Sequence, residues 1–118
     1  FAHAFEATLG YSKKLNHGEA VILGLKTATK FSLLNNILNI KEFKLIENHL
    51  YELNLPSDIN KFFSIKSQKK ILSFMKKDKK NNTKKINLVL LKKIGFPIYK
   101  LEFNEKKIQF FLKKELNK

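Results

Sequence analysis

The sequence has 118 residues and a net charge of +14, with 24 basic residues, all of them lysine, against 10 acidic residues. A chain of this length can bury one hydrophobic core, and its 43% hydrophobic content argues against disorder. Cysteine is absent, which excludes disulfides and thiolate metal sites and agrees with a reducing compartment. The longest apolar run, residues 20–25, is too short to span a membrane, and no signal peptide is visible. We therefore expect one globular domain in the cytoplasm.

The strongly basic character, with a pI near 10.0, is typical of proteins that bind nucleic acid or anionic membrane surfaces. Nucleic-acid readers depend on arginine, however, because its guanidinium is a planar fork of donors that grips phosphates and base edges. This chain has no arginine, and its lysines are spread over every predicted element after Gly10. The composition therefore favours a solvated lysine-rich surface, and a specific nucleic-acid-binding face is the minority interpretation.

The first part of the chain predicts two helices. Residues 1–9 have apolar side chains at helical spacing, and Gly10 stops this helix. After a polar loop at residues 11–16, residues 17–35 have the strongest helical pattern in the sequence, with Glu19 in the first turn, where a carboxylate suits the positive end of the helix dipole. We expect a broad apolar surface on this second helix, formed by Val21, Leu23, Leu25, Ala28, Phe31 and Leu34.

Two further helices follow, separated by a break that contains a proline. Residues 41–53 are amphipathic and predict the first of them. The break at residues 55–58 offers Ser57 or Asp58 as the cap of a short turn. Residues 67–77 predict the second helix, and a polar loop comes after it.

The hydrophobic period then changes from that of a helix to that of strands. Residues 86–91 and 98–103 predict two strands around a turn at residues 95–97. Asn104 then caps a last helix that continues to Leu116. We therefore predict a mainly α fold with one small β-hairpin near the C-terminus.

One histidine has the local features of a metal ligand. His17 starts a predicted helix and precedes Gly18, which lets the backbone pass close to a bound group, and neutral imidazole is a good zinc donor. A histidine at a helix start is more often a surface or capping residue, so this motif alone gives a metal site modest weight. His3 cannot share a helical face with His17 because Gly10 and the polar loop separate them. His49 is interpreted as a partly exposed helix residue without a role.

A lysine cluster surrounds Asp78 at the end of the helix predicted over residues 67–77. Lysines at this end of a helix are favourable for its dipole, which is the structural explanation. The functional explanation is an anion pocket in which one or two ammonium groups meet a phosphate or carboxylate, with Asp78 orienting a lysine. The residues alone leave both explanations open.

Several short segments follow one another along the chain: His3-Ala4-Phe5-Glu6-Ala7, Gly10-Tyr11, His17-Gly18-Glu19-Ala20-Val21, Gly24, Leu55-Pro56, Met75, Asp78-Lys79-Lys80, the strand at 86–91 and Lys93-Ile94-Gly95. In this order and at these separations they resemble the 3-dehydroquinate synthase family, over essentially the whole chain. The resemblance implies that residues 1–118 form the C-terminal, metal- and substrate-binding helical domain of the dehydroquinate synthase-like fold. The N-terminal NAD-binding domain would then lie outside this chain, and the isolated 118 residues would be inactive.

The resemblance also implies an activity. Enzymes of this family use NAD and a divalent metal, usually zinc, with cobalt as an alternative. They convert 3-deoxy-arabino-heptulosonate 7-phosphate into 3-dehydroquinate with release of phosphate, a step of the shikimate pathway to aromatic amino acids. The implied partners are this phosphorylated sugar acid, the N-terminal domain and a second copy in a homodimer of the full-length cytoplasmic enzyme.

Roles for individual residues follow from the family pattern. His17 matches the metal-ligand histidine of His-Gly-Glu, and His3 matches the catalytic histidine that lies at the substrate. Lys79 and Lys80 match the Asp-Lys-Lys segment, where a lysine contacts the anionic end of the substrate. The other metal-binding histidine would lie four residues before His3, and no NAD-binding residue falls within the chain. Ala2 departs from the family's usual glycine, a mild change unless a positive φ is needed there.

Three alternatives stay open at this point. A second sugar phosphate cyclase, such as a 2-deoxy-scyllo-inosose synthase, shares the metal and lysine segments. Iron-dependent alcohol and glycerol dehydrogenases share a helical domain with a His-Gly ligand, but the Asp-Lys-Lys segment and the hairpin argue against them. A lysine-rich nucleic-acid-binding module would instead gather its lysines on one face beside exposed aromatic rings.

Overall fold

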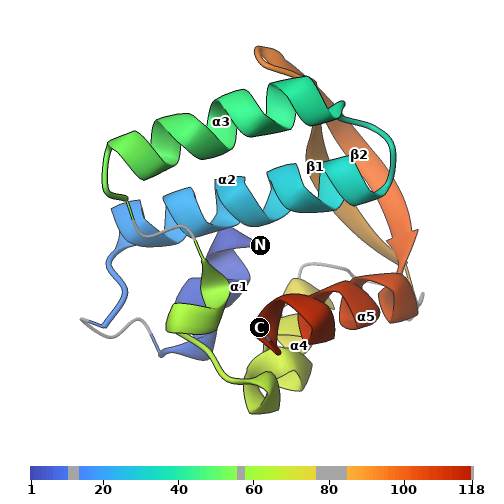
Figure 1. Ribbon diagram of the computed structural model, residues 1–118. Coiled ribbons are helices and arrows are strands. Elements are labelled where there is room, and N and C mark those ends of the chain that lie inside the picture. The colour runs from blue at the N-terminus through green and yellow to red at the C-terminus, as the bar shows by residue number, and fades with distance from the viewer. Residues whose placement is uncertain (11–13, 56–57, 77–84, 118) are drawn as a thin grey trace.

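The computed structural model describes residues 1–10, 14–55, 58–76 and 85–117. Their regular elements follow the predicted order (Figure 1): α1 (Ala2–Thr8), α2 (His17–Leu34), α3 (Ile40–Glu52), the 3-10 turns η1 (Ile59–Lys61) and η2 (Ile65–Ser67), α4 (Gln68–Lys76), β1 (Lys85–Lys93), β2 (Phe96–Asn104) and α5 (Glu105–Leu116). The prediction of a mainly α fold with one β-hairpin near the C-terminus is confirmed. Among these elements, no helix combines the length and the apolar character that crossing a membrane requires.

Helix α2 is the central element of the fold. In Figure 1, α3 runs along one side of α2, and α1, α4 and α5 lie on the other side. Strand β1 also packs against α2, and α4 contacts both α1 and α5. Helix α2 therefore has neighbours from several other elements.

The start of α2 is fixed by a capping box. The side chain of Asn16 accepts a hydrogen bond from the backbone N–H of Glu19 at 2.8 Å, and the Glu19 carboxylate accepts one from the backbone N–H of Asn16 at 3.0 Å. Two backbone donors that a helix start leaves unpaired are satisfied in this way. The helix therefore begins at His17, and Glu19 contributes a specific hydrogen bond in addition to its charge.

The buried stripe of α2 differs from the apolar surface that the sequence predicts. Leu23 and Phe31 are buried as expected, whereas Val21, Leu25 and Leu34 are about half exposed. The rest of the buried stripe consists of small or hydroxyl-bearing residues, namely Ala20, Gly24, Thr27, Thr29 and Ser32. Each hydroxyl donates a hydrogen bond to the carbonyl four residues earlier, so burial leaves no unpaired donor on these side chains.

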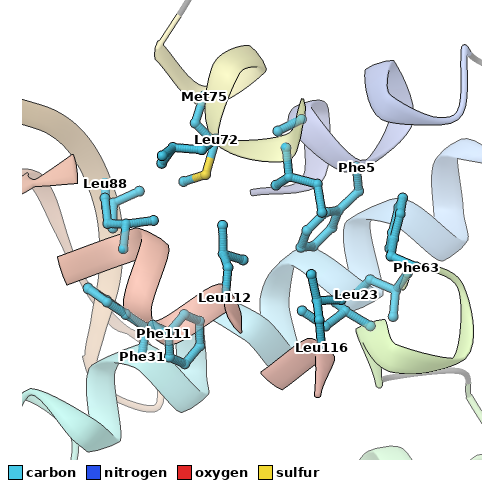
Figure 2. Close-up of a cluster of buried hydrophobic side chains, with 14 of the residues drawn as sticks. Phe5, Leu23, Phe31, Phe63, Leu72, Met75, Leu88, Phe111, Leu112 and Leu116 are labelled. Atoms are coloured by element: carbon cyan, nitrogen blue, oxygen red, sulfur yellow. The ribbon is translucent and has the colours of Figure 1, made fainter. Parts of the chain in front are cut away.

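Aromatic and aliphatic side chains from nearly every element meet in one core (Figure 2). The ring of Phe31 stands edge-on to those of Phe111 and Phe103, with ring centres 5.0 and 4.9 Å apart, a favoured geometry for aromatic pairs. Phe5 of α1 packs against Phe63, which follows η1, at 5.5 Å. The core therefore holds α1 firmly against the rest of the domain.

The hairpin is tied to the helices at both of its ends. β1 and β2 pair antiparallel, and alternate side chains of β1 (Ile86, Leu88 and Leu90) are buried. The Ser32 hydroxyl of α2 accepts a hydrogen bond from the backbone N–H of Leu91 at 3.1 Å. β2 begins at Phe96, so the turn is shorter than predicted and lies at residues 94–95, where Gly95 adopts a φ of +83°.

The capping predictions have mixed outcomes. Asn104 caps α5 as predicted, because its side chain accepts a hydrogen bond from the backbone N–H of Lys106 at 2.9 Å. Asp58 precedes the predicted short turn, η1, but its side chain makes no capping hydrogen bond. The Asp58 carboxylate lies instead 3.7 Å from the ammonium of Lys26 on α2, which offers a charge partner. Ser57 lies outside the described residues.

Candidate metal and substrate site

His17 projects from the first turn of α2, and its side chain contacts that of Glu6 on α1. Its imidazole Nδ1 lies 3.2 and 3.1 Å from the two carboxylate oxygens of Glu6 on α1. The two side chains differ in exposure: 79% of His17 is accessible, against 15% of Glu6. The carboxylate is therefore the fixed member of the pair, and the imidazole extends from it toward the outside of the domain.

The close packing of α1 on α2 brings Glu6 to His17. A Cβ atom added at Gly24 would lie only 2.7 Å from the Cβ of Ala2, so a glycine at position 24 is what lets the start of α1 approach α2. Helix α1 thus contacts α2 at two places. Ala2 lies against Gly24, and Glu6 contacts His17. Ala2 itself is helical, and positive φ values among the described residues occur elsewhere, so its departure from the family's glycine strains no backbone.

His3 lies at another part of α1, beside a small cavity of about 80 Å³. The cavity is lined by residues of α1, the end of α4 and the start of β1, including His3, Met75 and Ile86. These two elements flank residues 77–84 in the sequence. Asp78, Lys79 and Lys80, the lysine segment predicted to bind an anion, lie outside the described residues. The structure thus places His3 beside α4 and β1, the elements that precede and follow residues 77–84 in the sequence.

Helix α1 connects the two predicted site histidines. His3 and Glu6 are three residues apart, so they lie on neighbouring positions of one face of α1. Through Glu6 this helix contacts His17, and through His3 it lines the cavity beside α4 and β1. Helix α1 therefore reaches the surroundings of both histidines, although they occupy different helices.

A metal site cannot be completed by the described part of the chain. Residues 1–10, 14–55, 58–76 and 85–117 contain no group of three His, Asp or Glu side chains close enough to hold a metal ion. His17 has the chemistry of one ligand, since one ring nitrogen meets a carboxylate and the opposite nitrogen points away from Glu6. His49 on α3 is exposed.

Sequence reasoning did not single out Glu6. It lies in the same short segment as His3, but its partner is eleven residues further along and on a different helix. A signal was available in the pattern Glu-x-x-x-Gly followed by His, since a helix that stops at Gly10 can turn back and place its last turns beside the next helix. Periodicity alone does not say which residues then meet.

The fold and these side chains together define a mainly helical domain with one β-hairpin, which presents one carboxylate-bound imidazole. Comparison with known proteins gives the particular family. The family model described as 3-dehydroquinate synthase C-terminal matches residues 1–81, and the chain belongs to this family. The family resemblance seen in the sequence is thereby confirmed.

Individual relatives agree with the family model. The chain is 76% identical over all 118 residues to a 3-dehydroquinate synthase of Pelagibacter ubique, of which it covers 32%. It is 35% identical over 112 residues to the 3-dehydroquinate synthases of Zymomonas mobilis and Coxiella burnetii, covering 30% of each. The chain therefore spans about a third of the length of the curated relatives it matches.

Proposed function

We propose that this chain is the C-terminal part of a 3-dehydroquinate synthase. The complete enzyme is a cytoplasmic homodimer. It converts 3-deoxy-arabino-heptulosonate 7-phosphate into 3-dehydroquinate with release of phosphate, a step of the shikimate pathway. The observation that carries this proposal is the 76% identity to the Pelagibacter ubique synthase along the whole chain. Because the chain spans only about a third of that relative, the proposal includes an N-terminal NAD-binding domain, without which these 118 residues are inactive.

In this proposal His17 is one ligand of a divalent metal, zinc or alternatively cobalt. Imidazole is a common zinc donor, and a ligand histidine usually gives its second ring N–H to a carboxylate, the arrangement that Glu6 offers. When bound, the metal polarises the oxygen of the alcohol that is oxidised. The remaining ligands come from outside the described residues, in agreement with the absence of a three-residue cluster within them.

His3 and the lysine segment are assigned to the substrate. His3 lies at the rim of a cavity beside α4 and β1, where an imidazole can hold or pass a proton of a bound molecule. Lys79 and Lys80 bind the anionic end of the substrate, and their ammonium groups stabilise the charge of the departing phosphate. NAD carries the hydride and is bound by the N-terminal domain, so this chain contributes orientation, charge and one metal ligand.

The nucleic-acid alternative is not favoured. It requires exposed aromatic rings gathered on a basic face, whereas the rings that are exposed among the residues whose burial the structure describes, Tyr51, Phe96 and Phe110, lie one each on α3, β2 and α5. The nearest enzymatic alternative, another sugar phosphate cyclase, keeps the same roles for His17 and the lysines. The relatives reported above are all synthases of 3-dehydroquinate, which is why this substrate is preferred.

The proposal is tested in the complete enzyme, built by placing this chain in the matching segment of the Pelagibacter ubique synthase. We expect phosphate release from 3-deoxy-arabino-heptulosonate 7-phosphate with one zinc bound per chain. His17→Ala should abolish stoichiometric zinc binding and lower the turnover at least about 1,000-fold, because the Lewis acid is lost. His49→Ala, an exposed histidine elsewhere, is the matched control. Full zinc content and turnover in His17→Ala would contradict the ligand assignment.

A further inference from the structure

The contact between Glu6 and His17 assigns a specific task to a residue that the family motifs leave without one. We infer that Glu6 is a positioning residue: its carboxylate accepts the Nδ1–H of His17 and so reserves Nε2 for the metal. This inference rests on the proposed function, because it concerns how a metal ligand is prepared. It makes two separate claims, one about the position of the ring proton and one about metal affinity.

The position of the proton follows from the chemistry of the two groups. An ionised carboxylate has acceptor oxygens only, and a neutral imidazole has one N–H and one nitrogen with a lone pair. Both oxygens of Glu6 lie within 3.2 Å of the same ring nitrogen, Nδ1 of His17. The proton of the ring is therefore held on Nδ1, and the lone pair that a metal needs is on Nε2.

The exposure of the two side chains agrees with this division: Glu6 holds the imidazole in place, and His17 is accessible to a metal ion. Glu6 lies between Phe5 and Ala7, which are both buried, on a helix that packs closely against α2 at Gly24. His17 is largely exposed, and its ring continues outward from the carboxylate. A fixed acceptor at one edge of an exposed ring limits the ring's rotation and directs its other edge away from the domain.

Two simpler explanations fit the geometry less well. As a direct metal ligand, Glu6 would share the ion with Nδ1, with no hydrogen atom between the two groups, but both of its oxygens lie at hydrogen-bond distance from that nitrogen. As a stabilising ion pair, the contact would need both partners to be shielded, whereas His17 is accessible to solvent and such pairs contribute little to stability. Positioning of the imidazole accounts for both the geometry and the exposure.

The test uses the same complete enzyme with Glu6→Gln, Glu6→Ala and, as a matched control, Glu47→Gln, which changes a carboxylate in an ion pair elsewhere. Long-range proton–nitrogen NMR of metal-free protein with labelled histidine reports which ring nitrogen carries the proton, and His17→Ala identifies the signal. We expect the Nδ1–H form in the parent and in Glu6→Gln, whose amide oxygen still accepts. We expect a mixture of both forms in Glu6→Ala.

Zinc affinity, measured by competition with a chelator, gives the second readout. Glu6→Ala should bind zinc about 10- to 100-fold more weakly, the usual cost of losing such a partner, with Glu6→Gln between it and the parent and Glu47→Gln unchanged. An unchanged tautomer and unchanged affinity in Glu6→Ala would overturn the inference. A parent protein that binds no zinc would overturn the proposed metal function instead, and the NMR signal would still decide whether Glu6 holds the proton on Nδ1.

Discussion

Two polar contacts of this domain, one around Lys26 and one between Glu6 and His17, use similar groups for opposite purposes. Around Lys26 the cation is shielded, with 12% of its side chain accessible, while its carboxylate partners Glu47 and Asp58 are about half exposed. In the pair of Glu6 and His17 the carboxylate is shielded and the cation-forming ring is exposed. The role of each contact depends on which residue is shielded from solvent. The shielded Lys26 holds elements of the fold together, whereas the shielded Glu6 leaves the His17 imidazole available to a further partner.

The contacts of Lys26 explain its structural role. Its ammonium lies 3.3 Å from Glu47 on α3 and 3.7 Å from Asp58, which precedes η1, so one side chain of α2 connects three segments. The same ammonium lies 5.9 Å from the centre of the Phe43 ring of α3. Removing the carboxylates would leave a largely buried charge without opposite charges, which is costlier than removing the charge itself.

The largest effect on stability is expected when the carboxylate partners of Lys26 are removed. The double variant Glu47→Gln with Asp58→Asn should lower the free energy of unfolding by about 2 kcal/mol, because the Lys26 ammonium loses both counter-ions. Lys26→Met, which removes the charge and keeps most of the apolar stem, should cost about 1 kcal/mol. Urea unfolding of the complete enzyme measures both. If Lys26→Met lowered the free energy of unfolding more than the double variant does, the packing of the Lys26 stem, and not its charge, would account for its contribution to stability.

An intermediate effect is expected where α1 meets α2. Gly24→Ala places a methyl group 2.7 Å from the Cβ of Ala2, and the resulting shift should cost about 1–2 kcal/mol even though alanine favours the helix. Because α1 carries Glu6, zinc affinity should fall together with stability. Adding Ala2→Gly should restore only part of both, since the new methyl group also meets the Ala2 backbone at 2.8 Å. Stability that falls without any change in zinc affinity would show that Glu6 does not depend on this contact.

The smallest effect on stability should come from Glu6 itself. Glu6→Ala should change the free energy of unfolding of the metal-free protein by less than about 0.5 kcal/mol, because its partner is exposed and screened by water. The same urea titration, run beside the double variant at Glu47 and Asp58, measures the difference directly. A loss as large as that of the double variant would show that the Glu6–His17 contact stabilises the fold as the Lys26 ion pairs do.

The order of the helices and the hairpin could be predicted because these features are encoded locally. Gly10 ends α1, Asn104 caps α5, and the change from helical to alternating periodicity marks β1. The inner face of α2 was predicted less well, because hydroxyl groups such as that of Thr27 bond to their own helix and can be buried in place of Val21 or Leu25. Hydrophobicity alone does not reveal this possibility.

The candidate site could be predicted only in part, because its contacts depend on packing between helices and not on local signals. The special character of His17 follows from its place at a helix start, but the identity of its partner depends on how α1 folds back against α2. That packing is set by Gly24 and Ala2, which carry no chemistry of their own. The metal-ligand role of His17 and the substrate roles of His3, Lys79 and Lys80 come from the family resemblance and remain predictions.

The cap of α5 has a consequence for how the domain assembles. Asn104 is at once the last residue of β2, paired with Lys85 across the hairpin, and the residue that starts α5. No spacer separates strand from helix, so the direction in which β2 leaves the hairpin also sets the axis of α5. The register of the two strands therefore also sets where α5 lies, and with it the position of the buried Phe111 and Leu112 side chains in the core.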